Sequence, residues 1–299
     1  MAAIPYPTTM RTFKIWDSAD GAATAGRAFT ASIAQEVVPK VGDQLDFLKL
    51  GIKGAVSTAA VVIETFADII APFTLRKGAQ NRVILNLDEL CALMAFYYDE
   101  VPTIGENTDA TGNDFIGGLK IPVYDKFDDA AQFLVQADYA TQTNIATETI
   151  ALYGHSDTGE QGRAPIHAVR IPHTTSATAG IEQLSSQIVN EGTLLGIIIE
   201  TPNGFADGNT DTSIEKLKIY EEGKTVAEFN DLASVSFPTV IDYVTPTPMA
   251  DLLRKFRMYD LRPAGLDTSK KLTLGLDIQD VSDAIVIIPV IAKKSPCWE

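Results

Sequence analysis

The residue types of a hydrolase triad stand together once in the chain, at His155, Ser156 and Asp157. A nucleophile elbow requires the spacing G-x-S-x-G on a turn from strand to helix. Here Gly154 and Gly159 enclose four residues instead of three. Adjacent side chains also seldom form the line from nucleophile to base to orienting acid. We therefore interpret 154–163 as a linker and not as a catalytic site.

Oxygen-bearing side chains alternate at Asp207, Asn209 and Asp211, as the ligands of a calcium loop do. An EF-hand needs Gly at the sixth position and Glu at the twelfth, where this chain has Thr212 and Lys218. The sequence thus rejects an EF-hand. A looser cation site at Asp207, Asn209 and Asp211 stays open as a weak candidate beside a solvated turn.

The other metal-binding and redox residue types also lack a characteristic spacing. His155, His167 and His173 lie near one another in sequence, without H-x-H or H-E-x-x-H spacing, and we expect surface or linker histidines. With only two cysteines a disulfide framework is excluded. We expect Cys91 to lie in a core and Cys297 to be a free thiol.

No phosphate-binding glycine motif occurs, so we expect no nucleotide cofactor, no other cofactor and no enzymatic activity. The formal net charge of −15 argues against direct binding of nucleic acid, which depends on clustered Lys and Arg. We find neither a signal peptide at the N-terminus nor an apolar run long enough for a membrane helix.

The elements that would position any site repeat along the chain at an offset of roughly 140 residues. Residues 75–90 resemble 217–232, and residues 133–152 resemble 272–287. Short β-branched and aromatic runs bounded by Gly, Pro, Asn and Asp predict strands in both halves. The predicted strands are 45–52, 59–63, 69–75, 82–85, 119–123, 132–139, 147–153, 168–171, 193–201, 217–220, 225–229, 235–244, 271–278 and 284–291.

One amphipathic helix is predicted late in each half. Apolar residues at helical spacing predict the first helix over 87–97, and Thr247 with Pro248 marks the start of a second helix that runs to Met258. A Gly- and Asn-rich loop is expected over 101–118, and regular structure is expected to begin near Thr30.

These elements predict an all-β protein made of two tandem eight-stranded antiparallel jelly rolls, each with a short inserted helix. We expect an N-terminal arm over 1–29, the first jelly roll over 30–154 and a linker over 155–167. The second jelly roll then covers 168–292, and a C-terminal tail covers 293–299.

The pattern over about residues 30–292 resembles the double-jelly-roll major capsid proteins of tailless icosahedral viruses, the lineage of adenovirus hexon and membrane-containing bacteriophages. Three features carry the resemblance: the tandem repeat, the helices placed after 87–90 and 230–232, and the closing passage 260–266 followed by the strand 272–278.

The resemblance implies a structural protein of the virion. Two barrels would stand side by side, and three chains would form a homotrimeric, pseudo-hexagonal capsomer that contacts neighbouring capsomers. It also implies minor capsid or vertex proteins and an internal viral membrane as further partners. Assembly would take place in the host cytoplasm, and the compact chain suits a small bacterial or archaeal virus.

Other functions stay open at this point. A two-domain β-sandwich could be a binding module for carbohydrate or surface ligands, although Trp16 and Trp298 lie near the chain ends. Tandem cupins would need histidine ligands on strands, where we expect none. A tailed-phage shell protein would need a long spine helix, and no helical periodicity of that length occurs.

Overall fold

The computed structural model describes the protein over residues 11–17, 33–38, 44–56, 70–100, 103–106, 114–126, 132–139, 145–156, 164–184, 188, 192–201, 214–229, 255–279 and 282–293. Strands make up most of this part of the chain, as predicted. Among these residues α2 (Leu87–Tyr98) is the single helix. None of the described helical structure is long and apolar enough to span a bilayer.

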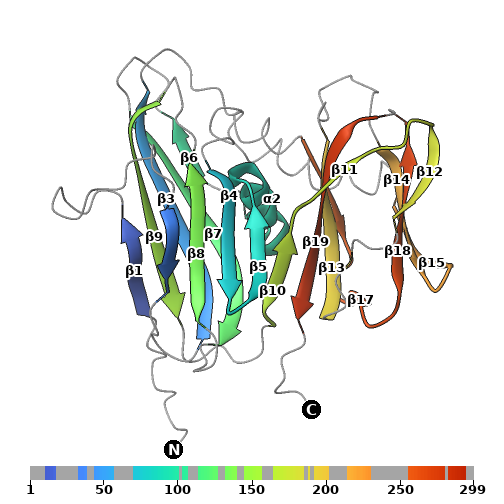
Figure 1. The fold of residues 1–299 in the computed structure, drawn as a ribbon, viewed down its shortest axis with the longest axis horizontal. Helices are drawn as coiled ribbons and strands as arrows, with labels where there is room; N and C mark the ends of the chain where they lie inside the picture. The colour runs from blue at the N-terminus through green and yellow to red at the C-terminus, as the bar shows by residue number, and fades with distance from the viewer. Residues whose placement is uncertain are drawn as a thin grey trace, which may run out of the picture.

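The described strands form three sheets, which we call the N-terminal, central and C-terminal sheets (Figure 1). The N-terminal sheet has the order β1 (Arg11–Asp17), β9 (Ile145–Ser156), β3 (Gln44–Val56), β7 (Asp114–Lys126) and β6 (Thr103–Glu106). The C-terminal sheet has the order β12 (Gly180–Leu184), β18 (Leu272–Ile278), β14 (Ile214–Glu221) and β15 (Lys224–Phe229).

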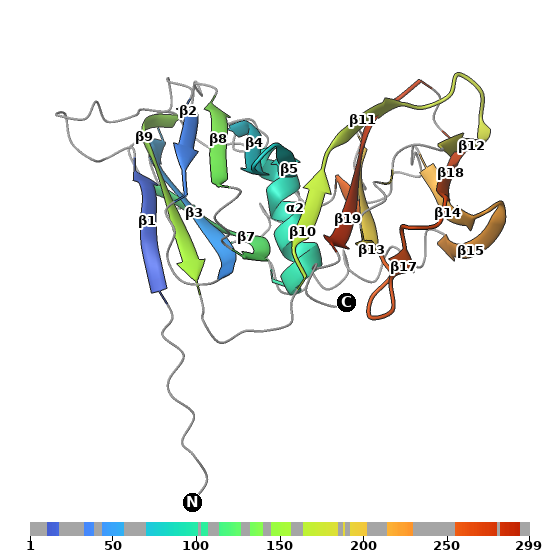
Figure 2. The same ribbon diagram turned by 60° about the horizontal axis from the view of Figure 1, so that its bottom comes forward.

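The central sheet contains strands from both halves of the chain. Its order is β16 (Phe256–Asp260), β13 (Gly192–Glu200), β19 (Ala284–Lys293), β10 (Ile166–Val169), β5 (Gln80–Leu85), β4 (Ile70–Lys77), β8 (Phe133–Tyr139) and β2 (Ile33–Val37). Two further strands join it, β11 (Ile171–Thr174) on β19 and β17 (Leu266–Asp267) on β13. Figures 1 and 2 show this sheet between the other two.

Two hydrophobic cores fill the spaces between the sheets. The first lies among the N-terminal sheet, α2 and the β5-to-β2 part of the central sheet, and the second lies between β13, β19 and the C-terminal sheet. In β13, Ile197 and Ile199 belong to the second core, whereas Ile198 belongs to the first. Burial on both faces explains the nearly continuous apolar sequence of this strand.

The sheet topology confirms the repeat that the sequence predicted. The order β5-β4-β8-β2 in the first half matches the order β15-β14-β18-β12 in the second. Likewise β1-β9-β3-β7 matches β10-β19-β13-β16. Each half is therefore a sandwich of two sheets.

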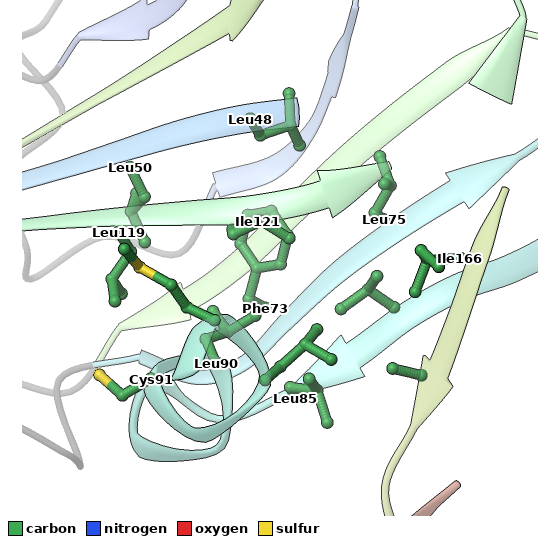
Figure 3. Close-up of a cluster of buried hydrophobic side chains, with 14 of the residues drawn as sticks. Leu48, Leu50, Phe73, Leu75, Leu85, Leu90, Cys91, Leu119, Ile121 and Ile166 are labelled. Atoms are coloured by element: carbon green, nitrogen blue, oxygen red, sulfur yellow. The ribbon is translucent and has the colours of Figure 1, made fainter. Parts of the chain in front are cut away.

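The predicted helix over 87–97 and the predicted place of Cys91 are confirmed. Residues 87–96 of α2 are buried, and Cys91 is fully inaccessible. Figure 3 shows Leu90 and Cys91 on α2 beside a cluster that includes Phe73, Leu85 and Ile121. Burial raises the pKa of the Cys91 thiol well above its ordinary value.

Three of the expectations about where strands and helices begin and end are wrong. Regular structure begins before Thr30, because 11–17 already form β1 on the edge of the N-terminal sheet. The expected loop over 101–118 contains β6 and the first residues of β7.

The end of the second predicted helix is also wrong. Phe256 and Met258 are buried in β16, which pairs with β13, so packing on the central sheet prevails over the helical spacing of the apolar residues. The preceding residues 247–254, and the predicted strands 59–63 and 235–244, lie outside the described residues.

Candidate functional site

The two halves join through the strand pair β5 and β10. Ala168 lies opposite Val83, and Val169 lies opposite Ile84, in a parallel pairing that continues as a backbone bond from the Arg170 N–H to the Ile84 carbonyl (3.0 Å). The other pairings in the described residues are antiparallel. We call this contact the junction; it makes one continuous sheet from both halves.

Helix α2 begins at the junction, at a turn that the sequence specifies. Glu89 stands three residues after Asn86, and its Oε2 accepts a hydrogen bond from the Asn86 N–H (2.7 Å), which is one half of a capping box. Asp88 and Glu89 both lie in the first turn, where the helix dipole favours negative charge.

The Glu89 carboxylate reaches across the junction. It is fully buried and pairs with the Nε of Arg170 at 2.8 Å. Burial raises the pKa of Glu89 to about 7, opposed by the Asn86 hydrogen bond and the Arg170 charge. Burial together with the charges of Asp88 and Glu89 likewise raises the pKa of Glu200, in β13, to about 8. The junction thus contains carboxyl groups that titrate near neutral pH.

The far end of α2 is held by the second half as well. Arg262 donates from Nη1 to the Tyr97 carbonyl (3.1 Å), and its guanidinium lies 4.7 Å from the centroid of the Phe96 ring. A Cβ on Gly196 would come within 2.5 Å of the Phe96 Cζ, so this glycine lets the ring approach the backbone of β13. Both ends of α2 therefore fix the first half on the second.

A basic cluster lies along the β5 side of the same junction. Asp125 pairs with Lys77 Nζ (2.8 Å) and with Arg82 Nη2 (3.0 Å), and all three side chains are nearly inaccessible. Burial and the neighbouring charges of Lys293 and Arg82 lower the pKa of His167 to about 4. Burial, and to a smaller extent the positive charge of Arg82, lowers the pKa of Lys293 to about 8. This cluster is a buried electrostatic contact, with one carboxylate among several bases.

His155 and Ser156 of the apparent triad do not contact each other as a catalytic pair. His155 and Ser156 are neighbours in β9, and Ser156 Oγ donates to the Gln44 carbonyl (2.6 Å). The His155 ring instead stacks on Phe47, with 4.4 Å between ring centroids. Asp157 lies outside the described residues. These contacts are structural.

The expectation that the three histidines avoid strands is wrong. His155 lies in β9, His167 is buried in β10, and His173 in β11 contacts Glu182 at 3.1 Å. Within the described ranges, no three His, Cys, Asp or Glu side chains are grouped to hold a metal ion. The weak cation site at Asp207, Asn209 and Asp211 falls in 202–213, outside those ranges, and stays a prediction.

Sequence reasoning missed the junction residues. Glu89 was predicted only as part of a helix, and Arg170 and Arg262 were not singled out. The spacing between Asn86 and Glu89, which is that of a capping box, was the one local signal available. Contacts between residues so far apart in sequence leave no local pattern.

No protein-family model matches the sequence, and no curated protein matches it. Solved structures match along almost the whole chain. The STIV MCP aligns at 10% identity over 95% of this chain and 97% of its own, with a TM-score of 0.67. The fold is that of the double-jelly-roll major capsid proteins.

Two further double jelly rolls extend the comparison. A chain from the atomic structure of Sulfolobus Turreted Icosahedral Virus aligns at 12% identity over 95% of this chain and 91% of its own, with a TM-score of 0.65. The major capsid protein P2 of bacteriophage PM2 aligns at 9% identity over 96% and 99%, with a TM-score of 0.54. The predicted fold class is thereby confirmed.

Proposed function

We propose that this chain is the major capsid subunit of an icosahedral virus, and that three copies form a pseudo-hexagonal capsomer. One observation carries the proposal: the chain aligns with major capsid proteins over 95% and 96% of its own length and over 97% and 99% of theirs. The proposal assigns the chain a building role in the virion shell and no catalysis. A two-domain binding module is not favoured, because the similar structures described above are major capsid proteins.

The junction gives this proposal a physical basis. A rigid pair of barrels supplies two similar positions per chain, so three chains supply the six positions of a hexagonal lattice point. In this proposal the predicted barrels 30–154 and 168–292 widen to 11–156 and 166–293, because β1, β9, β10 and β19 are strands of these barrels. The arm, the linker and the tail shorten from 1–29, 155–167 and 293–299 to 1–10, 157–165 and 294–299. Minor capsid or vertex proteins and an internal membrane are proposed as further partners, after assembly in the host cytoplasm.

Size-exclusion chromatography with light scattering tests the proposal on the purified full chain. We expect a particle of three times 32.2 kDa, or closed shells visible by negative-stain electron microscopy. A chain that stays monomeric up to millimolar concentration, in low and in physiological salt, contradicts it. Binding of that monomer to a carbohydrate array would favour the binding-module alternative.

A further inference from the structure

The hairpins β4–β5 and β14–β15 share one irregularity at the same place. In the first, Leu75 lies opposite Val83 and Arg76 lies opposite Asn81, so Arg82 is an extra residue. In the second, Ile219 lies opposite Ala227 and Tyr220 lies opposite Thr225, so Val226 is the extra residue. A shared bulge fixes the correspondence of the two strands residue by residue. Val83 therefore corresponds to Ala227, and Arg82 to Val226.

The strands β1 and β10 also correspond, and a shared bulge in the strands beside them shows it. β1 pairs with β9, and β10 pairs with β19. One bulge places Leu45 opposite Ser156 and Phe47 opposite His155 in the N-terminal sheet. Its counterpart places Leu194 opposite Ile291 and Gly196 opposite Val290, so His155 corresponds to Val290.

The partners of these two residues complete the correspondence. Thr12 of β1 lies opposite His155, and Ala168 of β10 lies opposite Val290. Thr12 therefore corresponds to Ala168.

Among the described residues, the two members of the junction thus have counterparts that end their sheets. Within the chain, β5 pairs with β10. The counterpart of β5 is β15, the terminal strand of the C-terminal sheet, and the counterpart of β10 is β1, the terminal strand of the N-terminal sheet. Figure 1 shows β1 and β15 on opposite sides of the molecule, so one chain cannot join them.

We propose that β15 of one copy pairs in parallel with β1 of the next copy, repeating the junction between chains. This inference rests on the proposed function and names the contact that builds the capsomer. Since Ala168 lies opposite Val83, the repeated register places Thr12 of one chain opposite Ala227 of its neighbour. A terminal strand is a template for pairing with another chain.

Exposure at the corresponding positions agrees with a contact completed by a second copy. Arg82 is 9% exposed at the junction, whereas its counterpart Val226 is 41% exposed and is one of two exposed large hydrophobic residues in the described chain. Ala168 is fully buried, whereas its counterpart Thr12 is exposed. Positions that the intrachain junction covers are thus uncovered where the next copy would lie.

The pairing joins two different surfaces, so it is heterologous. Such a contact closes into a ring when the rotation between copies divides a full turn, and otherwise grows into a filament. A ring of three chains contains six barrels joined alternately by β5–β10 within chains and β15–β1 between chains. The outer face of the N-terminal sheet, with Phe47 stacked on His155, would then be covered by the neighbour.

Disulfide trapping tests the register in full-length protein carrying Cys297→Ser. Strands in a sheet lie about 4.8 Å apart, within the Cα separation that a disulfide spans. Thr12→Cys with Ala227→Cys should give covalent dimers and trimers under mild oxidation, and no larger species. Thr12→Cys with Lys218→Cys is the control, because Lys218 lies in β14, an interior strand of the same sheet.

A second pair of variants gives an independent readout. Val226→Asp should raise the concentration for half-assembly at least tenfold, whereas Ile181→Asp, at the other exposed large hydrophobic residue, should leave it unchanged. Circular dichroism identifies a variant that has not folded. If the unmodified chain is trimeric but cross-linking does not exceed the control, the strand pairing is wrong and the capsid proposal stands. If the unmodified chain never assembles, the capsid proposal itself fails.

Discussion

The Nε of Arg170 donates hydrogen bonds to both carboxylate oxygens of Glu89, at 2.8 and 3.0 Å, across the junction of the two jelly rolls. Glu89 also accepts the N–H that precedes α2, so one buried carboxylate links the start of the helix to the second half. Removing one partner of a buried pair costs far more than an exposed pair contributes. Loss of either partner is therefore expected to weaken the junction.

The raised pKa of Glu89 predicts a pH dependence of stability. Between its ordinary value of 4.5 and about 7 the folded state holds more protons than the unfolded state, so the free energy of unfolding falls as pH rises. The expected loss from Glu89 alone is about 3 kcal/mol between pH 4.5 and pH 8. Glu89→Gln keeps an acceptor for Asn86 and Arg170 without titrating, so its stability should depend less on pH. Urea unfolding at pH 5, 6, 7 and 8 measures the difference.

His167 changes the stability with pH in the opposite direction, so its contribution has to be removed by a control. His167 has a pKa lowered to about 4, so its contribution is lost as pH falls from 6.5 through 4. Subtracting the Glu89→Gln curve from that of the unmodified protein removes this contribution. Glu215 on β14, whose side chain is 43% exposed, provides a matched Glu→Gln change. Equal pH slopes for the unmodified protein and Glu89→Gln would show that Glu89 does not titrate in this range.

Much of the fold was predictable because burial leaves periodic patterns. In β14, Leu217 and Ile219 enter the second core while Lys218 pairs with Glu228 outside, and the sequence alternates accordingly. The repeat was visible since β4–β5 and β14–β15 use the same hairpin. By contrast, β1 was missed although Phe13, Ile15 and Trp16 are apolar, because the small, weakly patterned residues that follow it favour an arm.

The junction was not predictable, for a physical reason. Local patterns report which side chains are buried, not which distant segment buries them. Phe256 and Met258 have apolar positions that fit a helix, and only their packing on β13 makes them a strand. Ser156 has the residue type of a catalytic nucleophile, yet its hydroxyl only donates a hydrogen bond to the Gln44 carbonyl. Glu89 and Arg170 meet only after both halves have folded.

Gly196 is predicted to be essential to the fit of α2 on the second half. A methyl group there would lie 2.5 Å from both the Phe96 Cζ and the Tyr259 carbonyl oxygen, one of which is rigid backbone. Gly196→Ala should therefore lower the free energy of unfolding by about 1–3 kcal/mol. Gly118→Ala is the matched control in β7, because no atom lies within 4 Å of its added methyl. Similar urea midpoints for the two variants would refute the prediction.

Asp125 is predicted to balance the basic cluster. Asp125→Asn leaves Lys77 and Arg82 buried without their carboxylate, and we expect a loss of about 3–5 kcal/mol in the free energy of unfolding. Asp277→Asn is the comparison, because Asp277 is more exposed and lies 3.9 Å from Lys216. Its expected loss is below about 1 kcal/mol. A similar loss in both variants would mean that burial of the cluster does not increase the contribution of Asp125 to the free energy of unfolding.

The stacking of Arg262 on Phe96 predicts that a lysine cannot replace this arginine. Its planar guanidinium contacts the ring at 4.7 Å while Nη1 donates to the Tyr97 carbonyl and Nη2 to Asp260 (2.8 Å). Lysine keeps the positive charge, but its ammonium group lacks the several N–H donors and the planar surface of a guanidinium group. Arg262→Lys should lower the free energy of unfolding by about 1–2 kcal/mol, since it loses a stacking contact and a hydrogen bond. The contacts with Phe96 and Tyr97 join Arg262 to α2 and do not depend on an exposed ion pair, so the loss of stability should persist at high salt. The control is Lys270→Ala, which breaks an exposed ion pair with Glu221 and should cause almost no loss of stability at high salt. Full stability of Arg262→Lys in urea at both salt concentrations would show that charge alone holds this end of the helix.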